Sequence, residues 1–439
     1  MNQRDRQILR IALPSIVSNI TVPLLGMIDV AIVGHMGSPV YIGAVAVGSM
    51  IFNLVYWLFG FLRMGASGLT AQALGRRDLA EVTSLLVRSV TLALGIALLF
   101  IVLQMPLRGL MFWLIGPTAD VAPIATTYFY IVIWGAPASL ALFSLMGWYI
   151  GMQNTRIPMF VSIMQNVVNI LASLTLVYGF GMKIEGVALG TVIAQYTGFF
   201  VALALLVRYY GKIWRGKWNL PSTFHKYFAF LQVNRDIFLR TFCLVAVNLC
   251  FTAAGARQGA VILSVNTILM QLYLFFSYFM DGFAYAGEAL CGKSYGAGNG
   301  VAFRETLRRL WLWMVIVTAA YTLLYIIGGR WIVGLLTDEP QVVETTGEYL
   351  WWAWLIPAAG CVAFIWDGVF IGMTATRGML VSSFLAALAF FAIYGGSQLF
   401  TSHASLITNH FLWLAQVTYL AMRGVLQTIW YRLRLNKVI

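Results

Sequence analysis

"IGMQNTR" at residues 150–156 recurs as "IGMTATR" at residues 371–377, with five of seven residues identical and an offset of 221. At the same offset "TAQALGRRD" (70–78) aligns with "CGKSYGAGN" (291–299). The offset is close to half of the 439-residue chain. Two matches at one offset indicate that the sequence is an internal duplication of a single long unit.

The composition places this duplication in a membrane. Of the residues, 61% are hydrophobic and only 10% are charged, and the mean hydropathy is +0.84. Globular chains have about 25% charged residues, and about 20 apolar residues cross a hydrocarbon core of ~30 Å. The sequence therefore predicts an all-α integral membrane protein. The twelve expected transmembrane spans are 8–34, 40–66, 86–106, 122–149, 158–179, 185–207, 237–255, 259–289, 309–328, 346–372, 379–399 and 404–431.

The basic residues indicate the orientation. With these spans, nearly all of the 28 lysines and arginines fall on the side of the termini, and the other side has only Arg108, Lys183, Arg257 and Arg330. The positive-inside rule then places both termini in the cytoplasm. The net charge of +13 is thereby explained by topology and lipid headgroups, and not by a nucleic-acid partner.

Each copy of the repeat carries six spans, so both copies have the same orientation in the membrane. The predicted domains are an N-terminal six-helix lobe (1–207), a basic cytoplasmic linker (208–236) and a C-terminal six-helix lobe (237–439). Two pseudo-symmetric lobes around an axis along the membrane normal leave a central cleft, and rocking of the lobes gives alternating access. This arrangement favours a transporter over a channel or a membrane enzyme.

Asp29 stands in the apolar stretch "MIDVAIVGHMG" (27–37). Ionisable residues inside a membrane are costly, so each is a functional candidate. Burial favours the neutral carboxyl group, and Asp29 could gain and lose a proton as the cleft opens to either side. Pro14 and Pro23 make the same span kinkable. The alternative is a structural carboxylate that is hydrogen-bonded to a neighbouring helix.

The fifth and sixth spans offer polar partners for this carboxylate. Asn166, Asn169 and Ser173 follow one helical face at i, i+3 and i+7, and Thr191 and Gln195 are one turn apart on the next span. Such residues also join transmembrane helices without any other role.

Four further charges lie inside spans: Arg63, Asp281, Asp367 and Glu288. Arg63 aligns with Ala284 in the repeat, on the span that carries Asp281. We expect Arg63 to pair with Asp281 or Asp367 as an inner gate when the cytoplasmic side is closed. Glu288, near the cytoplasmic end of its span, is expected to be solvated or to lie at the gate rim.

No catalytic or nucleotide-binding motif is visible, and Cys243, Cys250, Cys291 and Cys361 lack the spacing of a metal site. We therefore expect no enzyme activity, no metal and no cofactor. Transport would draw on an ion gradient.

Several stretches together resemble the DinF branch of the multidrug and toxic compound extrusion (MATE) family. The resemblance covers the chain from residue 8 to about 430. The stretches that carry it are "LPSIVSNITVPLLGMIDVAIVGHMGSPVYIGAVAVG" (13–48), "FLRMGASGLTAQALGRRD" (61–78), "NRDIFLR" (234–240) and "DGFAYAGEALCGKSYGA" (281–297).

The resemblance implies a twelve-helix, two-lobe antiporter that expels small amphipathic, often cationic compounds with an inward proton or sodium gradient. We expect a monomer, because both lobes are in one chain, in a bacterial cytoplasmic (inner) membrane. The family's first-helix carboxylate matches Asp29, its kink proline Pro14, its fifth-helix asparagine Asn169 and its sixth-helix threonine Thr191. Where the family has a second aspartate, this chain has Ser173. A single carboxylate favours proton coupling over sodium coupling. The acids expected in the cleft favour cationic or zwitterionic cargo, and a lipid-type flippase is the alternative.

Overall fold

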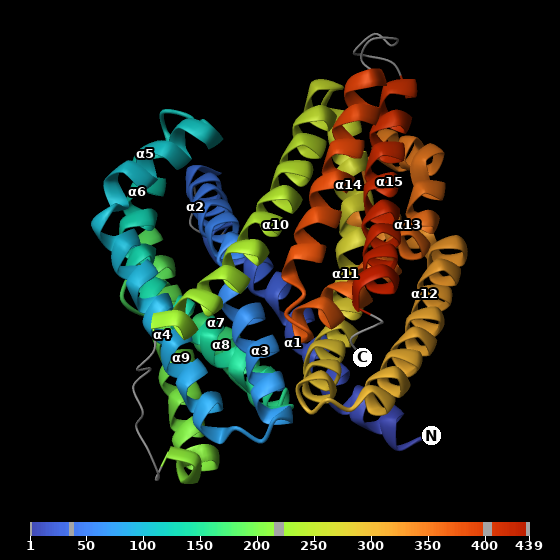
Figure 1. Cartoon of the computed structure of the whole chain (residues 1–439). Helices are drawn as coiled ribbons and strands as arrows, with labels where there is room; N and C mark the ends of the chain where they lie inside the picture. Colours follow the sequence, from blue (N-terminus) through green and yellow to red (C-terminus); the bar gives the residue numbers. More distant parts are fainter. Residues whose placement is uncertain (1, 35–38, 215–223, 398–405, 436–439) are drawn as a thin grey trace. The chain divides into compact units, whose positions relative to one another are not determined.

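The computed structural model describes residues 2–34, 39–214, 224–397 and 406–435. Every regular element in these ranges is a helix (Figure 1). Ten helical segments within residues 40–397 are long and apolar enough to cross a membrane, while α1 and α15 cover the first and the twelfth expected spans. The helices are α1 Gln3–Gly34, α2 Pro39–Leu58, α3 Phe61–Gly75, α4 Leu79–Val102, α5 Gln104–Ile115, α6 Val121–Val132, η1 Ile133–Gly135, α7 Ala136–Gly151, α8 Arg156–Leu174, η2 Thr175–Gly179, α9 Ile184–Trp214, α10 Phe224–Arg257, α11 Ala260–Gly296, α12 Gly300–Leu336, α13 Pro340–Gly372, α14 Thr376–Ser397, α15 Leu406–Trp430 and η3 Tyr431–Leu435.

The observed helices differ in places from the expected spans. The span expected at 40–66 is two helices, because α2 ends at Leu58 and α3 starts at Phe61 after a break that includes Gly60, a residue that weakens helices. Helix α5 is not among the expected spans, and it has no buried residue. Helices α9 and α10 both continue into the segment assigned to the linker, up to Trp214 and from Phe224.

The chain forms two compact units. The first unit comprises residues 13–234, and the second comprises residues 1–12 together with residues 235–439. The boundaries between the units therefore fall inside helices α1 and α10.

The repeat is visible in how helices cross inside each unit. In the first unit, a Cβ added to Gly147 of α7 would lie 2.1 Å from the backbone oxygen of Arg63 in α3. In the second unit, a Cβ added to Gly368 of α13 would lie 2.1 Å from the backbone oxygen of Ala284 in α11. Both pairs are related by the 221-residue offset, so each unit packs its corresponding helices backbone to backbone at the same place.

The turns before α4 and α12 repeat as well. Arg77 and Gly298 both have positive φ, 59° and 64°. Asp78 and Asn299 then cap the two helices by accepting from the backbone N–H three residues ahead. These positions also share the offset. The pseudo-symmetric duplication predicted from the sequence is therefore confirmed.

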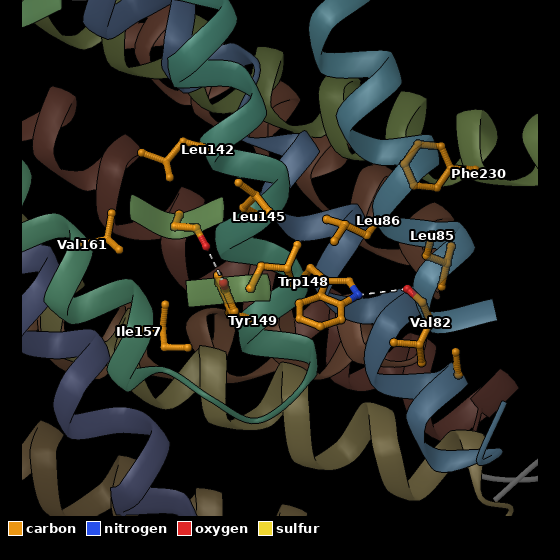
Figure 2. Close-up of a cluster of buried hydrophobic side chains, with 13 residues drawn as sticks. Val82, Leu85, Leu86, Leu142, Leu145, Trp148, Tyr149, Ile157, Val161 and Phe230 are labelled. Atoms are coloured by element: carbon orange, nitrogen blue, oxygen red, sulfur yellow. Dashed lines mark hydrogen bonds between the residues drawn. The ribbon is translucent and has the colours of Figure 1, made fainter. Parts of the chain in front are cut away.

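The first unit has a core of buried side chains from α3, α4, α7, α8, α9 and α10 (Figure 2). Trp148 and Tyr149, both fully buried, lie at its centre. The indole Nε1 of Trp148 donates to the carbonyl oxygen of Val82 at 2.9 Å, and the hydroxyl of Tyr149 donates to that of Ala202 at 2.7 Å. Both polar groups are thus satisfied inside the core, which joins α7 to α4 and α9.

Candidate ion-coupling site

A polar layer joins α8 and α9 in the first unit. The side-chain amide of Asn169 on α8 donates to the hydroxyl oxygen of Thr191 on α9 at 3.1 Å. Thr191 in turn donates to the carbonyl oxygen of Val187 at 3.1 Å. The sequence predicted that Asn169 and Thr191 would belong to one site, and the structure brings them into direct contact.

Three oxygens in and around this layer have no hydrogen-bond partner among the described residues. They are Oδ1 of Asn169, Oγ of Ser173 and Oε1 of Gln195, and all three residues are buried. The Ser173 hydroxyl lies against Gly190 of α9, where an added Cβ would come within 2.3 Å of it. Because buried polar atoms are normally paired, these oxygens are available to a group that the described side chains do not supply.

Helix α1 packs beside α8 just before this layer. The side-chain amide of Asn166 donates to the carbonyl oxygen of Thr21 at 2.9 Å, and the hydroxyls of Thr21 and Ser162 are 3.4 Å apart. Asp29 is eight residues beyond Thr21 in the same helix, and Ser173 is seven residues beyond Asn166. At 1.5 Å per residue these steps are ~12 and ~10 Å, so Asp29 and Ser173 lie at similar distances beyond this contact along their own helices.

The side chains of Asp29 and Pro23 lie outside the described residues, although both positions belong to helix α1. Pro14 is half-buried in the same helix. Helix α1 is therefore continuous through both prolines, and the expected kink positions are interior to one element.

The second unit holds a buried charged cluster around Asp367 of α13. One carboxylate oxygen accepts hydrogen bonds from the guanidinium groups of Arg240 on α10 and Arg423 on α15, the latter at 2.5 Å. The other oxygen accepts from the side-chain amide of Gln427 at 2.7 Å. Both arginines are more than nine-tenths buried. The cluster therefore carries one negative and two positive formal charges.

Arg240 and Arg423 were not predicted as site residues, because the charge distribution groups them with the cytoplasmic basic residues. The available signal was their position inside the expected spans 237–255 and 404–431. Their pairing with Asp367 changes the interpretation of the cargo, since this aspartate is not an uncompensated acid.

The remaining predicted gate residues are in different units. Arg63 lies on α3 of the first unit, whereas Asp281 and Glu288 lie on α11 of the second. The pairing of Arg63 with Asp281 or Asp367 stays a prediction. Glu288 was expected to be solvated, and this is wrong: its residue is 1% exposed, because α11 packs against α13 so closely that Gly372 meets the backbone of Glu288.

Among the described residues, no three His, Cys, Asp or Glu side chains gather as a metal site would require. The ligands that this region offers are the neutral oxygens of the polar layer.

Comparisons with known proteins identify the family. Residues 14–175 and 237–394 match the MatE family, and the two segments correspond to the two copies of the repeat. The chain is 37% identical to DNA damage-inducible protein F of Escherichia coli (strain K12), over 98% of this chain and 93% of that protein. It is 22% identical to a probable multidrug resistance protein NorM of Thermotoga maritima, over 77% and 74% of the two chains.

Solved structures share the fold. A crystal structure of a MATE in the bent conformation has a TM-score of 0.86 and 15% identity, and covers 100% of this chain and 96% of that one. The Vibrio cholerae MATE transporter VcmN in its bent form has a TM-score of 0.86 and 15% identity, over 99% and 98% of the two chains. The sequence matches, the repeat and the shared fold together show that the chain belongs to the MATE family of multi-pass membrane transporters.

Proposed function

We propose that this transporter exports small amphipathic compounds by proton antiport, with Asp29 as the residue that gains and loses the proton. The observation that carries the proposal is the pair of unpartnered oxygens on Asn169 and Ser173, on the helix against which α1 packs. A neutral carboxyl group needs an acceptor, which Asn169 Oδ1 can be. An ionised carboxylate needs a donor, which the Ser173 hydroxyl can be.

Both protonation states of Asp29 would thus find a partner of the required polarity in one polar layer. This is the property of a proton-loading site, because neither state would be left without a hydrogen bond in a membrane interior. A carboxyl group with only donors around it would stay ionised, and one with only acceptors would stay neutral.

Sodium coupling is the second candidate, because oxygens are also the ligands that hard cations prefer. The region offers oxygens of Asn169, Ser173 and Thr191, but Thr191 Oγ already accepts from Asn169 and donates to Val187. Asp29 is then the single negative charge available. We therefore favour the proton.

For the cargo, we propose an amphipathic compound with a cationic or zwitterionic group. The acids that support a positive charge are now Asp29 and Asp281, since two arginines more than compensate Asp367, and Glu288 is buried where α11 meets α13. We place the transporter in a bacterial cytoplasmic membrane with both termini in the cytoplasm, from the distribution of basic residues.

The test is dye efflux from proteoliposomes under an imposed pH gradient, repeated under a sodium gradient. Proton-driven efflux supports the proposal. Sodium-driven efflux refutes the proposed ion, and the absence of efflux under both gradients favours a lipid-type flippase.

A further inference from the structure

In two helices, α1 and α10, the first turns belong to one compact unit and the rest of the helix belongs to the other. Residues 1–12, which include the start of α1, belong to the second unit, and residues 13–34 of the same helix belong to the first. In α10, residues 224–234 belong to the first unit and residues 235–257 to the second. Both helices open a copy of the repeat, and the two boundaries are within one residue of its 221-residue offset. The exchange is therefore reciprocal.

Ion pairs hold the start of α1 in the second unit. Asp5 is 7% exposed. Its carboxylate accepts from the indole Nε1 of Trp313 on α12 at 3.3 Å and lies 3.7 Å from the guanidinium of Arg309 on the same helix. One turn earlier on α12, Glu305 pairs with Arg4 at 3.1 Å. Two residues of α1 thus engage three consecutive turns of α12.

Apolar packing supports these pairs. Ile8, Ile11 and Ala12 are almost completely buried, and they lie on the face of α1 that also carries Asp5. Trp313, which binds Asp5, stacks on Phe283 of α11 at 6.0 Å between ring centroids. The first turns of α1 therefore have one buried face and belong to the second unit.

The start of α10 is built into the first unit in the same way. Phe230 is 2% exposed and belongs to the buried cluster with Leu86 and Leu206 (Figure 2). Asn234 is also buried, and its side chain fits against Gly65 of α3, where an added Cβ would lie 2.3 Å from the amide oxygen.

Pro14 lies two residues beyond the boundary in α1. A proline has no backbone N–H, so α1 lacks the hydrogen bond to the carbonyl of Arg10 at this point and bends more easily there. One of the two prolines of α1 thus adjoins the boundary between its two parts.

We propose that the first turns of α1 and of α10 are reciprocal anchors, each of which moves as one body with the unit that holds it. A change at Asp29, farther along α1, is transmitted to the second unit through the anchored turns 3–12. The residues Asp5, Arg309 and Trp313 are then positioning residues for coupling and not part of the ion site. This inference rests on the proposed role of Asp29.

A flexible insertion tests the transmission. Three glycines inserted after Ala12 should lower the initial rate of ion-driven dye efflux about tenfold, while equilibrium dye binding stays unchanged. The matched control is the same insertion after Met1, which leaves the anchored turns connected to Pro14 and should transport like wild type. Equal transport by both insertion variants would overturn the inference.

A disulfide tests whether the anchor stays in place. Arg4→Cys and Glu305→Cys are introduced after Cys243, Cys250, Cys291 and Cys361 are replaced by alanine. Oxidation should leave the efflux rate within about twofold of the reduced protein. A block that dithiothreitol reverses would show that the turns must detach, which contradicts the inference.

In both experiments, dye efflux is measured in parallel under a pH gradient and under a sodium gradient. A wild type driven only by sodium refutes the proposed ion, and the anchor is still tested under the gradient that drives transport. If the insertion after Ala12 abolishes both efflux and dye binding, the insertion has damaged the dye-binding site. The disulfide between positions 4 and 305 then decides whether the first turns of α1 stay attached to α12 during transport.

Discussion

The amide of Asn169 donates to the hydroxyl of Thr191 at 3.1 Å, while the oxygen of the same amide is buried and has no partner among the described residues. Thr191 therefore fixes the orientation of the Asn169 amide and leaves its oxygen as a buried acceptor. This pair is the part of the candidate site that the structure shows in atomic detail.

Removing the Thr191 hydroxyl should impair coupling without unfolding the protein. In Thr191→Val, Asn169 loses the acceptor that orients it, and proton-driven dye efflux should fall about tenfold, as expected for lost positioning of a functional group. Thr197→Val is the matched control, because Thr197 is on the same helix, also donates to a carbonyl in its own helix and is not buried. Efflux that falls equally in both variants would contradict the role of Thr191.

Adding a second carboxylate should change the ion preference. In Ser173→Asp the polar layer would contain two acids with Asp29, which increases the attraction for a metal cation. We expect efflux that responds to a sodium gradient in this variant and not in wild type. Ser173→Asn, of similar size and without charge, separates charge from bulk. An Asp variant without sodium dependence would weaken the argument from the single carboxylate.

Loss of Asp367 should destabilise the second unit. In Asp367→Asn, Arg240 and Arg423 remain buried without their counter-charge, and breaking a buried pair in this way costs about 3–5 kcal/mol. The apparent melting temperature in detergent should therefore drop clearly. Arg235→Gln breaks a pair whose arginine is 62% exposed, and it should cost less than about 1 kcal/mol. Similar melting temperatures for the two variants would refute the pairing as the main role of Asp367.

Substitution of the glycine at each of the two equivalent helix crossings, Gly147 and Gly368, should lower stability to a similar extent. A methyl group at Gly147 or at Gly368 would meet a carbonyl oxygen of the crossing helix at 2.1 Å. Gly147→Ala and Gly368→Ala should therefore each cost about 1–3 kcal/mol, measured as loss of thermal stability. Gly95→Ala in α4 is the control, because no atom lies within 4 Å of its added Cβ, and alanine is the better helix former. A destabilising effect at Gly95 equal to the other two would contradict the crossing geometry.

Much of the fold could be predicted from the sequence, since apolar stretches and a repeat at one offset are local patterns. The positions that share that offset, such as Gly147 and Gly368, also pack alike. The ends of helices were harder to predict, because α9 and α10 continue through basic residues whose low hydropathy suggests a loop. Helix α10 can hold the charged Arg240 in the protein interior because Asp367 pairs with it.

For the same reason the Asp367 cluster was only half predicted. Arg240 and Arg423 look like topology residues in a linear sequence, and only the packing of α10, α13 and α15 brings them to one carboxylate. Glu288 was misjudged because its nearness to a helix end suggested solvent, whereas a close crossing of α11 and α13 covers it. Asn169 and Thr191 could be assigned to one site in advance, since each has a defined place on a helix face and the two helices are consecutive, but their direct hydrogen bond was not predicted.

The central claim is that the proton load of Asp29 drives export. The measurement that tests it most directly is dye efflux from proteoliposomes under a pH gradient, with wild type compared with Asp29→Asn. We predict that wild type exports the dye and that Asp29→Asn binds it but does not export it. Proton-driven efflux by Asp29→Asn at the wild-type rate would contradict the claim.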